Sequence, residues 1–482
     1  MTYLRTSLQR APSVVLIATL SILMGLGCGN GEAQTGDGED DNSLANRRPG
    51  NDIDPWEVES VIPFDENGGF RLRMATDGEG TLGVAFFGNE ARIGEPCEEV
   101  GGDDPPNKVL WSLYFSDNSS GEWETELVHE LPFLGAPAGL DLGYDSQGRA
   151  VIATMTGEPV DSLAGYCGVN NVGVLTRESR DDWSYETAVS ESDEAATGEP
   201  ASDAGYVVGY WPALAMDSSG QPAVAYRDIH FGGIQADDFR RADLEFVHRV
   251  GGGWQAEPVD WGNGAGVRNR MVFDADDQPV IAYYTPQESR IEDRLGYWVS
   301  WRDDGEWKRQ QIFNQGNTEE LSVAIDSQGN LRVLFYDSEF GRPTLATLSD
   351  WENFNSISQW EFEDLGDRTY DEGYSPSLAI SADGDIVAAY HRCTRASSGL
   401  GNCEPQFSSL IFVHKDRGEW IHEEVDAGEG LENCGQAPAL LFDGDQPVIA
   451  YRCETIEDDI VSTEVRISRR SPLRDADSDG DD

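Results

Sequence analysis

The sequence predicts an all-β fold in which seven four-stranded antiparallel sheets form the blades of a β-propeller. Two recurring segments lead to this prediction. One is an apolar run, an Asp-x-x-Gly turn and a second apolar run, seen most clearly as ALAMDSSGQPAVAY at 213–226. The other is a tryptophan followed by alternating polar and apolar residues. Repeats about 60 residues long are typical of stacked or radial arrays of one supersecondary unit.

The Asp-x-x-Gly turn joins the first two strands of each unit, named A and B here. An Asp that opens a turn hydrogen-bonds its own backbone, and Gly supplies the positive φ that closes it. Apolar runs on both sides of such a turn predict a hairpin. The residues that open the seven turns are Asp77, Asp145, Asp217, Asp274, Asp326, Ser381 and Asp443.

Two further strands, C and D, complete each unit. Strand C alternates with period two, as in LEFVH at 244–248, and strand D begins near the tryptophan. Four antiparallel strands make a propeller blade, and the lack of a 3.6-residue apolar period excludes a helical repeat. We expect the tryptophans to pack between blades; they are Trp56, Trp123, Trp183, Trp254, Trp307, Trp360 and Trp420.

The two ends of the array complement one another. The last unit has strands A (439–442), B (447–451) and C (463–468) with no tryptophan strand after them, whereas the first element is a lone tryptophan strand at 56–61. Pairing that strand into the last blade would cover two exposed sheet edges. The sequence therefore predicts a seven-bladed ring that the Trp56 strand closes.

The N-terminus predicts export. Arg5 and Arg10 precede an apolar run at 11–24 that is short for a membrane span. The following MGLGC resembles the lipobox of bacterial lipoproteins, although Gly25 replaces the usual Leu. The resemblance implies lipidation of Cys28 and, since residue 29 is not Asp, the outer membrane of a Gram-negative cell. Secretion with cleavage nearby, into the periplasm or to the cell surface, is the alternative.

Composition sets the remaining boundaries. Residues 1–28 form the signal peptide, and 29–53 form a tether too poor in apolar residues to fold. The propeller occupies 54–470, and an acidic tail occupies 471–482. The tail begins like a calcium-binding loop, with Asp-x-Asp-x-Asp-Gly at 475–480, but it lacks the Glu that such a loop needs at its twelfth position. We therefore predict that the protein binds no cofactor or metal, with calcium binding as the alternative.

The formal net charge of -55, from 34 basic and 89 acidic residues, limits the partners. Such a surface repels nucleic acid and anionic lipid. We therefore expect no nucleic-acid partner. The expected attachment to a membrane is through the N-terminal lipid, and we expect the protein to be a monomer.

Six cysteines besides Cys28 predict disulfides in an oxidising compartment. All six fall in the B–C loops or D–A links, which share one side of the ring. Adjacency favours Cys97 with Cys167, which leaves four cysteines around the last two blades; of their pairings we choose Cys393 with Cys403 and Cys434 with Cys453 as the prediction. A zinc site is the alternative, but no C-x-x-C spacing occurs.

The same side of the ring, the loop face, is where we expect a site, because binding residues gather on long, variable loops. Arginines there could clamp a carboxylate, and aromatic rings could stack on a sugar. The alternative is that each arginine pairs with a neighbouring acid, such as Asp228 or Asp337. The candidate ligand-binding residues are Trp211, Arg227, Arg270, Tyr284, Tyr336, His391, Arg392 and Arg452.

Over residues 56 to about 470 the repeat rhythm resembles the Asp-box or BNR-repeat propellers, which include sialidases and some polysaccharide lyases. Segment 116–123 (SDNSSGEW) echoes the Asp-box, as do 303–307 and 415–420 more loosely. The stronger Asp-x-x-Gly lies in the A–B turn, whereas the family places its motif in the C–D turn. A sialidase also needs an arginine triad, a Tyr/Glu pair and an acidic Asp, which no motif assigns here.

Three functions remain open. The first is a binding module for a glycan or protein, favoured because the sequence has no Ser-His-Asp signature, phosphate loop or metal-ligand cluster. The second is a glycan-cleaving hydrolase or lyase that uses the Arg, Tyr and His candidates. The third is a structural role on the cell surface. Whether the arginines converge on one pocket or pair separately with acids distinguishes them.

Overall fold

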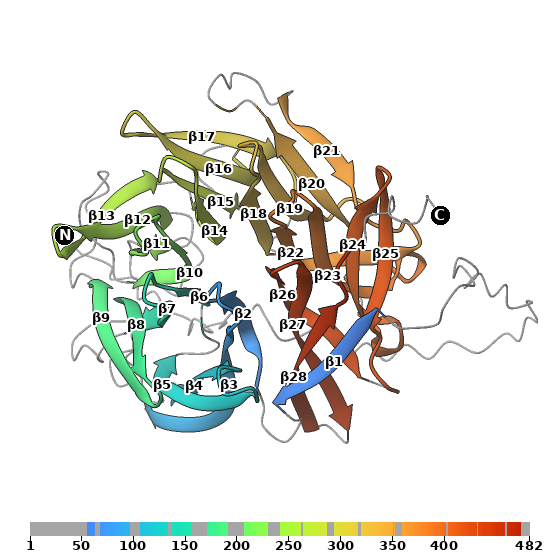
Figure 1. Cartoon of the computed structure of the whole chain (residues 1–482), viewed down its shortest axis with the longest axis horizontal. Helices are drawn as coiled ribbons and strands as arrows, with labels where there is room; N and C mark the ends of the chain where they lie inside the picture. Colours follow the sequence, from blue (N-terminus) through green and yellow to red (C-terminus); the bar gives the residue numbers. More distant parts are fainter. Residues whose placement is uncertain are drawn as a thin grey trace, which may run out of the picture. The chain divides into compact units, whose positions relative to one another are not determined.

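The computed structural model describes residues 55–62, 68–96, 107–133, 137, 139–156, 171–190, 207–229, 242–261, 264–286, 294–316, 320–349, 351, 359–401, 403–430, 432–457 and 460–473. Within them, 28 β-strands form seven four-stranded antiparallel sheets arranged as a ring (Figure 1). Two short 3₁₀ turns, η3 (Ala396–Ser398) and η4 (Pro405–Phe407), lie between strands of the sixth blade. The predicted fold class is confirmed.

The first four blades follow the chain in order. Blade 1 contains β2 (Phe70–Thr76), β3 (Leu82–Pro96), β4 (Asn107–Asp117) and β5 (Glu124–Phe133). Blade 2 contains β6 (Leu140–Tyr144), β7 (Ala150–Thr156), β8 (Asn171–Ser179) and β9 (Asp182–Val189). Blade 3 contains β10 (Val207–Met216), β11 (Pro222–Ile229), β12 (Ala242–Val250) and β13 (Gly253–Asp260). Blade 4 contains β14 (Val267–Phe273), β15 (Pro279–Thr285), β16 (Gly296–Asp303) and β17 (Glu306–Phe313).

The last three blades complete the ring. Blade 5 contains β18 (Leu321–Ile325), β19 (Leu331–Asp337), β20 (Arg342–Leu348) and β21 (Glu361–Asp364). Blade 6 contains β22 (Tyr370–Ile380), β23 (Ile386–Arg395), β24 (Ser409–Asp416) and β25 (Glu419–Asp426). Blade 7 contains β26 (Asn433–Asp443), β27 (Gln446–Glu457), β28 (Ile460–Arg470) and, at its outer edge, β1 (Trp56–Ile62).

Strand β1 closes the ring as predicted. It pairs antiparallel with β28, from Trp56 opposite Arg470 to Ile62 opposite Val465. The two ends of the propeller therefore share one sheet, and β1 (blue) lies beside β28 (red) in Figure 1. The seven A strands contact one another in sequence around the axis, from β2 through to β26 and back to β2.

The A–B turns form as the Asp-x-x-Gly pattern predicts. In blade 3, Asp217 Oδ1 accepts the backbone N–H groups of Ser219 (2.9 Å) and Gln221 (2.9 Å), and Gly220 takes a positive φ of 76°. These bonds satisfy backbone donors that the turn would otherwise leave unpaired. The same two acceptor contacts recur at Asp77, Asp145, Asp274 and Asp326.

The tryptophans of the D strands pack against the preceding blade, as expected. Trp183 meets Phe115 at 5.4 Å and Trp307 meets Phe246 at 5.6 Å between ring centroids, both edge to face. The indole N–H groups of three of them donate to an acid on the preceding D strand: Trp56 to Glu423 (2.8 Å), Trp183 to Glu126 (3.0 Å) and Trp420 to Glu363 (3.2 Å). Each aromatic contact of this kind adds to the burial of apolar area between blades.

Ion pairs repeat the same connection at the outer edge. A cation on strand C contacts an acid on strand D of the blade before it. The pairs are Arg177–Glu126, Arg249–Glu186, Arg302–Glu257, Lys415–Glu363 and Arg470–Glu423. The more exposed of these pairs are individually weak and mainly set the orientation of neighbouring blades, whereas Arg177–Glu126 and Arg470–Glu423 are largely buried.

Two disulfides lie in the last two blades, between Cys393 and Cys403 and between Cys434 and Cys453. These two predicted pairs are confirmed. The expected Cys97–Cys167 pair, the signal peptide with Cys28, the tether and most of the acidic tail lie outside the described residues. No helix among the described residues is long and apolar enough to cross a membrane.

Candidate functional site

The central channel carries two rings of side chains from the A strands. In the inner ring, each residue lies opposite the residue that precedes the B-strand aromatic, or Thr154 in its place in blade 2, as Arg73 lies opposite Ala85. The inner ring consists of Arg73, Asp141, Ala213, Arg270, Ser322, Ser377 and Ala439. The outer ring, two residues earlier in each blade, consists of Arg71, Gly139, Trp211, Arg268, Glu320, Ser375 and Ala437.

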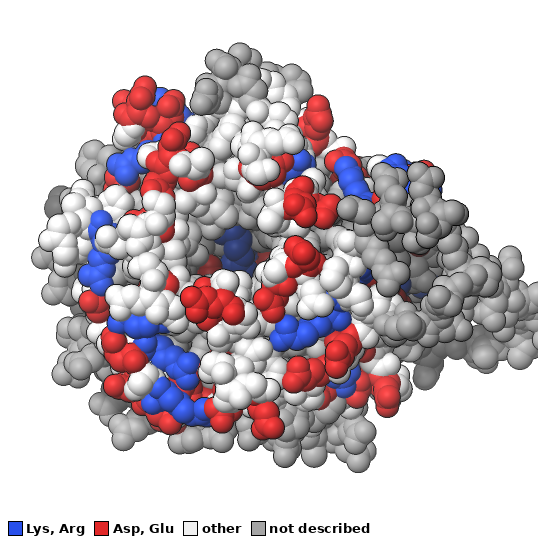
Figure 2. Space-filling view, in the orientation of Figure 1, with Lys and Arg blue, Asp and Glu red and all other residues white. Residues whose placement is uncertain are grey.

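Five of the seven blades place at least one small residue (Gly, Ala or Ser) in these rings, which suits the taper of a propeller. Blades 1 and 4 instead place an arginine in both rings. Figure 2 shows basic side chains deep in the central hollow of the ring. The lining of the hollow includes all four arginines, Trp211 and Glu320, and these side chains fill most of its space.

A backbone irregularity directs these side chains. The register shifts between Phe70 and Arg73 and between Val267 and Arg270, and the intervening Arg71 and Arg268 adopt φ of 58° and 53°. A β-bulge of this kind re-aims a side chain. Trp211, Ser375 and Ala437 share the left-handed conformation, so it belongs to the propeller design and not to the arginines alone.

The four arginines, called the arginine cradle below, converge on the carboxylate of Glu320. Glu320 Oε1 lies 3.7 Å from Arg71 and 3.2 Å from Arg268. Glu320 Oε2 lies 3.2 Å from Arg73 and 2.9 Å from Arg270. Each oxygen thus meets one arginine from blade 1 and one from blade 4. The five side chains keep 11–19% of their surface exposed, so the cradle is partly open to solvent.

Two carboxyl groups beside the cradle have opposite pKa shifts. Burial raises the pKa of Asp141 to about 6, although Arg73 and the backbone N–H groups of Leu214 and Leu142 oppose that change. Burial would also raise the pKa of Glu320, but Arg73, Arg268 and Arg71 together outweigh it and lower that pKa below its ordinary value. With both acids ionised, the four arginines leave two positive charges in excess.

Trp211 forms one wall of the hollow. Its ring is approached by the guanidinium groups of Arg268 (5.7 Å) and Arg227 (5.3 Å), and its carbonyl accepts the amide of Asn269 (2.7 Å). Cation–π contacts of this kind hold an indole ring in place. The indole is therefore fixed beside the cradle by the residues that flank it.

Two of the candidates from the sequence, Trp211 and Arg270, line the hollow. Two others, Arg227 and Tyr284, are buried away from it. Arg227 is 2% exposed and donates to the carbonyl of Gly264 (3.1 Å). Tyr284 is 3% exposed and donates to the carbonyl of Gly316 (3.1 Å). Both side chains join a B strand to the link that leads into the next blade.

The remaining four candidates also have partners within the blades. The hydroxyl of Tyr336 donates to Asp371 (2.8 Å), and His391 Nε2 lies 3.0 Å from the Asn433 side chain. Burial lowers the pKa of His391 to about 4, so its imidazole is neutral at pH 7. Arg392 pairs with Glu372 (2.9 Å), and Arg452 pairs with Glu454 (3.0 Å). For Arg392 and Arg452, therefore, the alternative stated above holds: each arginine pairs with a neighbouring acid and does not join a common ligand site.

Arg71 and Arg73 supply half of the cradle, and neither is among the candidates that the sequence pattern indicated. A signal for them exists, since Arg-x-Arg-Met occurs at 71–74 and again at 268–271, at the same position relative to strand A. Glu320 lay at an unmarked position before β18. Its role follows from the way the ring closes around the axis.

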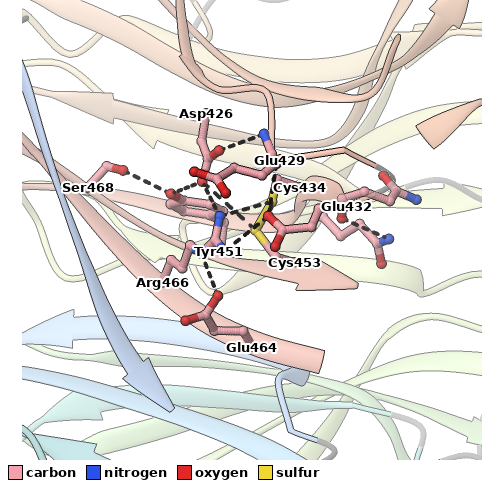
Figure 3. The surroundings of a disulfide bond; sticks show 12 residues. Asp426, Glu429, Glu432, Cys434, Tyr451, Cys453, Glu464, Arg466 and Ser468 are labelled. Carbon is pink, nitrogen blue, oxygen red and sulfur yellow. Dashed lines mark hydrogen bonds and ion pairs between the residues drawn. A yellow bond between two sulfur atoms is a disulfide. The ribbon is translucent and has the colours of Figure 1, made fainter. Parts of the chain in front are cut away.

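A second polar cluster surrounds the Cys434–Cys453 disulfide (Figure 3). The guanidinium of Arg466 contacts three carboxylates and one sulfur; the partners are Asp426 (3.0 Å), Glu432 (3.1 Å), Glu464 (2.6 Å) and Cys434 Sγ (3.3 Å). The carboxylate of Asp426 and the sulfurs of Cys434 and Cys453 lie close enough together for a metal site. However, the two sulfurs are bonded to one another and offer no thiolate to a metal.

Blade 4 shows what the Arg466 cluster does. There, without cysteines, Tyr283 donates to Asp260 (2.7 Å) and Arg294 pairs with the same acid (2.9 Å). Tyr451 and Arg466 of blade 7 make the corresponding contacts with Asp426, the last residue of β25 in blade 6. Because both acids end a D strand, we assign these clusters to fixing the D–A link, and the cradle remains the candidate site.

No protein-family model matches the sequence, and no curated protein matches it. Among solved structures, the chain is similar to a protein of unknown function from Dyadobacter fermentans (12% identity, TM-score 0.43, covering 86% of this chain and 99% of that one). It is also similar to Trypanosoma rangeli sialidase in complex with sialic acid (9%, 0.39, 86% and 59%) and to a polysaccharide lyase (10%, 0.41, 81% and 88%). We infer no activity from similarities at this level.

Proposed function

We propose that this protein is an exported binding module that holds a carboxylate-bearing ligand, specifically an acidic glycan, at the arginine cradle. The observation that supports the proposal is the convergence of four arginines from opposite blades on one carboxylate. Hydrogen bonds between guanidinium and carboxylate are charge-assisted and directional, so they favour a carboxylate over a neutral group. Trp211 offers an adjacent aromatic wall for a sugar ring.

The surface charge narrows the ligand further. The protein as a whole carries a formal charge of -55, whereas the hollow is locally positive. A polyanion would be repelled on its approach to such a surface, whereas a mostly neutral saccharide with one acidic residue would not. We therefore propose an oligosaccharide that presents a single uronic or sialic acid, with an acidic protein segment as the competing ligand class.

Export is part of the proposal. Disulfides persist in oxidising compartments, and two are present in the last blades. We propose that the chain is lipidated at Cys28 and held by the tether at 29–53, at the outer membrane or cell surface of a Gram-negative bacterium. Replacing Cys28 with Ser should then move the protein from the membrane fraction to the soluble fraction.

One observation supports an enzyme as the second candidate. Two carboxyl groups whose environments push their pKa values apart are a common arrangement for a catalytic acid and its partner, as Asp141 and Glu320 are here. However, a carboxylate that four guanidinium groups stabilise is a weak base and a weak nucleophile. A hydrolase or lyase would therefore depend on Asp141 as its acid, and binding without cleavage is the function we favour.

Calorimetric titration with matched saccharides tests the proposal. Oligosaccharides that end in a uronic or sialic acid should bind, and the same sugars with the carboxylate converted to an amide should not. In a Glu320→Ala background, where no internal carboxylate shares the cradle, replacing Arg268 with Gln removes a hydrogen bond to a charged group worth about 1.5–3 kcal/mol, so the affinity should fall by about tenfold or more. Chromatography of the same mixtures detects any cleavage product.

Arg302 provides the matched control. It is also partly buried (23% exposed) and paired with an acid, Glu257, but it lies on the outer edge of the ring. Arg302→Gln should leave the affinity unchanged. Equal binding of acid and amide, or equal losses in the Arg268 and Arg302 variants, would contradict the proposal. Product formation that disappears with Asp141→Asn would establish the enzyme instead.

A further inference from the structure

We propose that Glu320 is a built-in occupant of the arginine cradle, which a ligand carboxylate must displace, and that this competition determines which ligands bind. The inference rests on the proposed function because it concerns the same cradle. Glu320 directly precedes β18 in blade 5, whereas the arginines come from β2 and β14. It occupies the outer-ring position at which blades 1 and 4 place Arg71 and Arg268.

The geometry is that of a bound carboxylate. All four arginines have Glu320 as an ion-pair partner, and its two oxygens are divided equally between the two blades. Its side chain is 11% exposed, so it fills the cradle without being sealed into it. A ligand carboxylate that binds the four guanidinium groups must therefore use the positions of the Glu320 oxygens.

Charge explains why the position is filled. Four guanidinium groups around one small hollow repel one another, and the energy of that repulsion rises as water is excluded. Glu320 supplies one compensating negative charge from inside the chain, and Asp141 supplies another beside Arg73 (3.8 Å). When a ligand carboxylate replaces Glu320, the compensation in the cradle is preserved while the Glu320 side chain moves to solvent.

Competition from Glu320 makes the site selective. A group tethered within the same chain acts at an effective concentration of the order of millimolar or more. A small carboxylate such as acetate, which has no further contacts, cannot overcome that advantage at low concentration. A ligand succeeds when it also contacts the surrounding wall, which includes Leu140, Trp211 and Pro212. Glu320 thus acts as a specificity-determining residue that excludes simple organic anions.

Chemical rescue tests whether the cradle accepts a free carboxylate once Glu320 is removed. We expect Glu320→Ala to lower the melting temperature, because four cations are left with less compensation. Sodium acetate at tens of millimolar should restore it, since a ligand that binds only the folded state stabilises that state. Sodium chloride at equal ionic strength should restore it less. Glu320→Gln, which keeps the shape and loses the charge, serves if the alanine variant does not fold.

Glu257→Ala is the matched control, because it removes an acid from a single arginine, Arg302, on the outer edge. Acetate should not raise its melting temperature above the effect of chloride, and it should leave the wild type unchanged. The inference is overturned if acetate restores the Glu320 variants no better than chloride does, since that result means general screening. It is also overturned if Glu257→Ala responds to acetate equally.

The saccharide titration separates this inference from the proposed function. An acid-ending oligosaccharide should bind Glu320→Ala at least about tenfold more tightly than wild type, because its competitor is gone. If wild type binds the saccharide and the Glu320 variants show neither acetate rescue nor tighter binding, the occupant role is refuted and the binding function stands. If acetate rescues the variants and no saccharide binds either protein, the glycan function is refuted and the occupant role stands.

Discussion

Replacing Trp56 with alanine should weaken the closure between the first and last strands of the ring. The indole of Trp56 is 7% exposed and packs edge to face on Phe412 of blade 6, with 5.0 Å between ring centroids. Its Nε1–H donates to Glu423 Oε2 at 2.8 Å. One side chain of β1 therefore attaches the outer edge of blade 7 to blade 6.

The magnitude follows from what the substitution removes. Deleting a large buried aromatic side chain costs about 3–5 kcal/mol. The lost hydrogen bond adds little, because Glu423 keeps Arg470 (2.6 Å) and His414 (3.2 Å) as partners. With about 2.1 cal/mol/K of unfolding entropy per residue, a propeller of roughly 400 residues loses about 1 °C of Tm per kcal/mol. We therefore expect Trp56→Ala to lower the Tm by about 4 °C.

Differential scanning calorimetry measures this change, and hydrogen exchange locates it. Val58 lies in the same strand with 46% of its surface exposed, so Val58→Ala should cost less than about 0.5 kcal/mol. Amides of β1 and β28 should lose protection in Trp56→Ala before those of other blades. Equal Tm values for the two variants, with β1 amides still protected, would refute the claim that this side chain closes the ring.

Three further predictions concern pH and redox state. Affinity for an acidic saccharide should rise several-fold as the pH falls from 7 to 5. Asp141, with its raised pKa of about 6, loses its negative charge in that range, so the cradle becomes more positive. Asp141→Asn should flatten the pH profile of the affinity. Arg470 and other hydrogen-bond donors outweigh burial and lower the pKa of Glu423 to about 2. The stabilisation of the folded state by ionised Glu423 is therefore present above pH 4.5 and is lost as the pH falls towards 2. Glu423→Gln should make the Tm less sensitive to pH in that range. Replacing Cys434 and Cys453 with Ser should cost about 2–4 kcal/mol, measured as a Tm difference that disappears under reducing conditions.

The fold was largely accessible from the sequence because its determinants are local. Asp217 and Gly220 make a turn from within one hairpin, and that turn recurs in almost every blade. The lone strand at Trp56 also carried long-range information, because an unpaired sheet edge needs a partner and the last unit lacked one. Periodicity therefore predicted the blade, the number of blades and the closure.

The candidate site was accessible only in part. Arg270 and Trp211 were chosen because they lie near the start of an A strand, and both reach the hollow. Arg452 was chosen because it directly follows the B-strand aromatic, and Arg392 because it follows His391 at that place; both pair with acids of their own blades. A B strand is one strand removed from the axis, so its polar side chains meet neighbouring strands and links before they meet the channel.

The sequence by itself determined the repeating unit, because turn chemistry and strand alternation act over fewer than about ten residues and the tryptophans mark each recurrence of the unit, about 60 residues apart. Only the tertiary structure decided which side chains share the axis. Arg73 and Glu320 are 247 residues apart and come from different blades, yet they meet at 3.2 Å because the A strands pack around one channel. No local pattern records such a meeting, since it depends on the number of blades and on the angle at which each enters the ring.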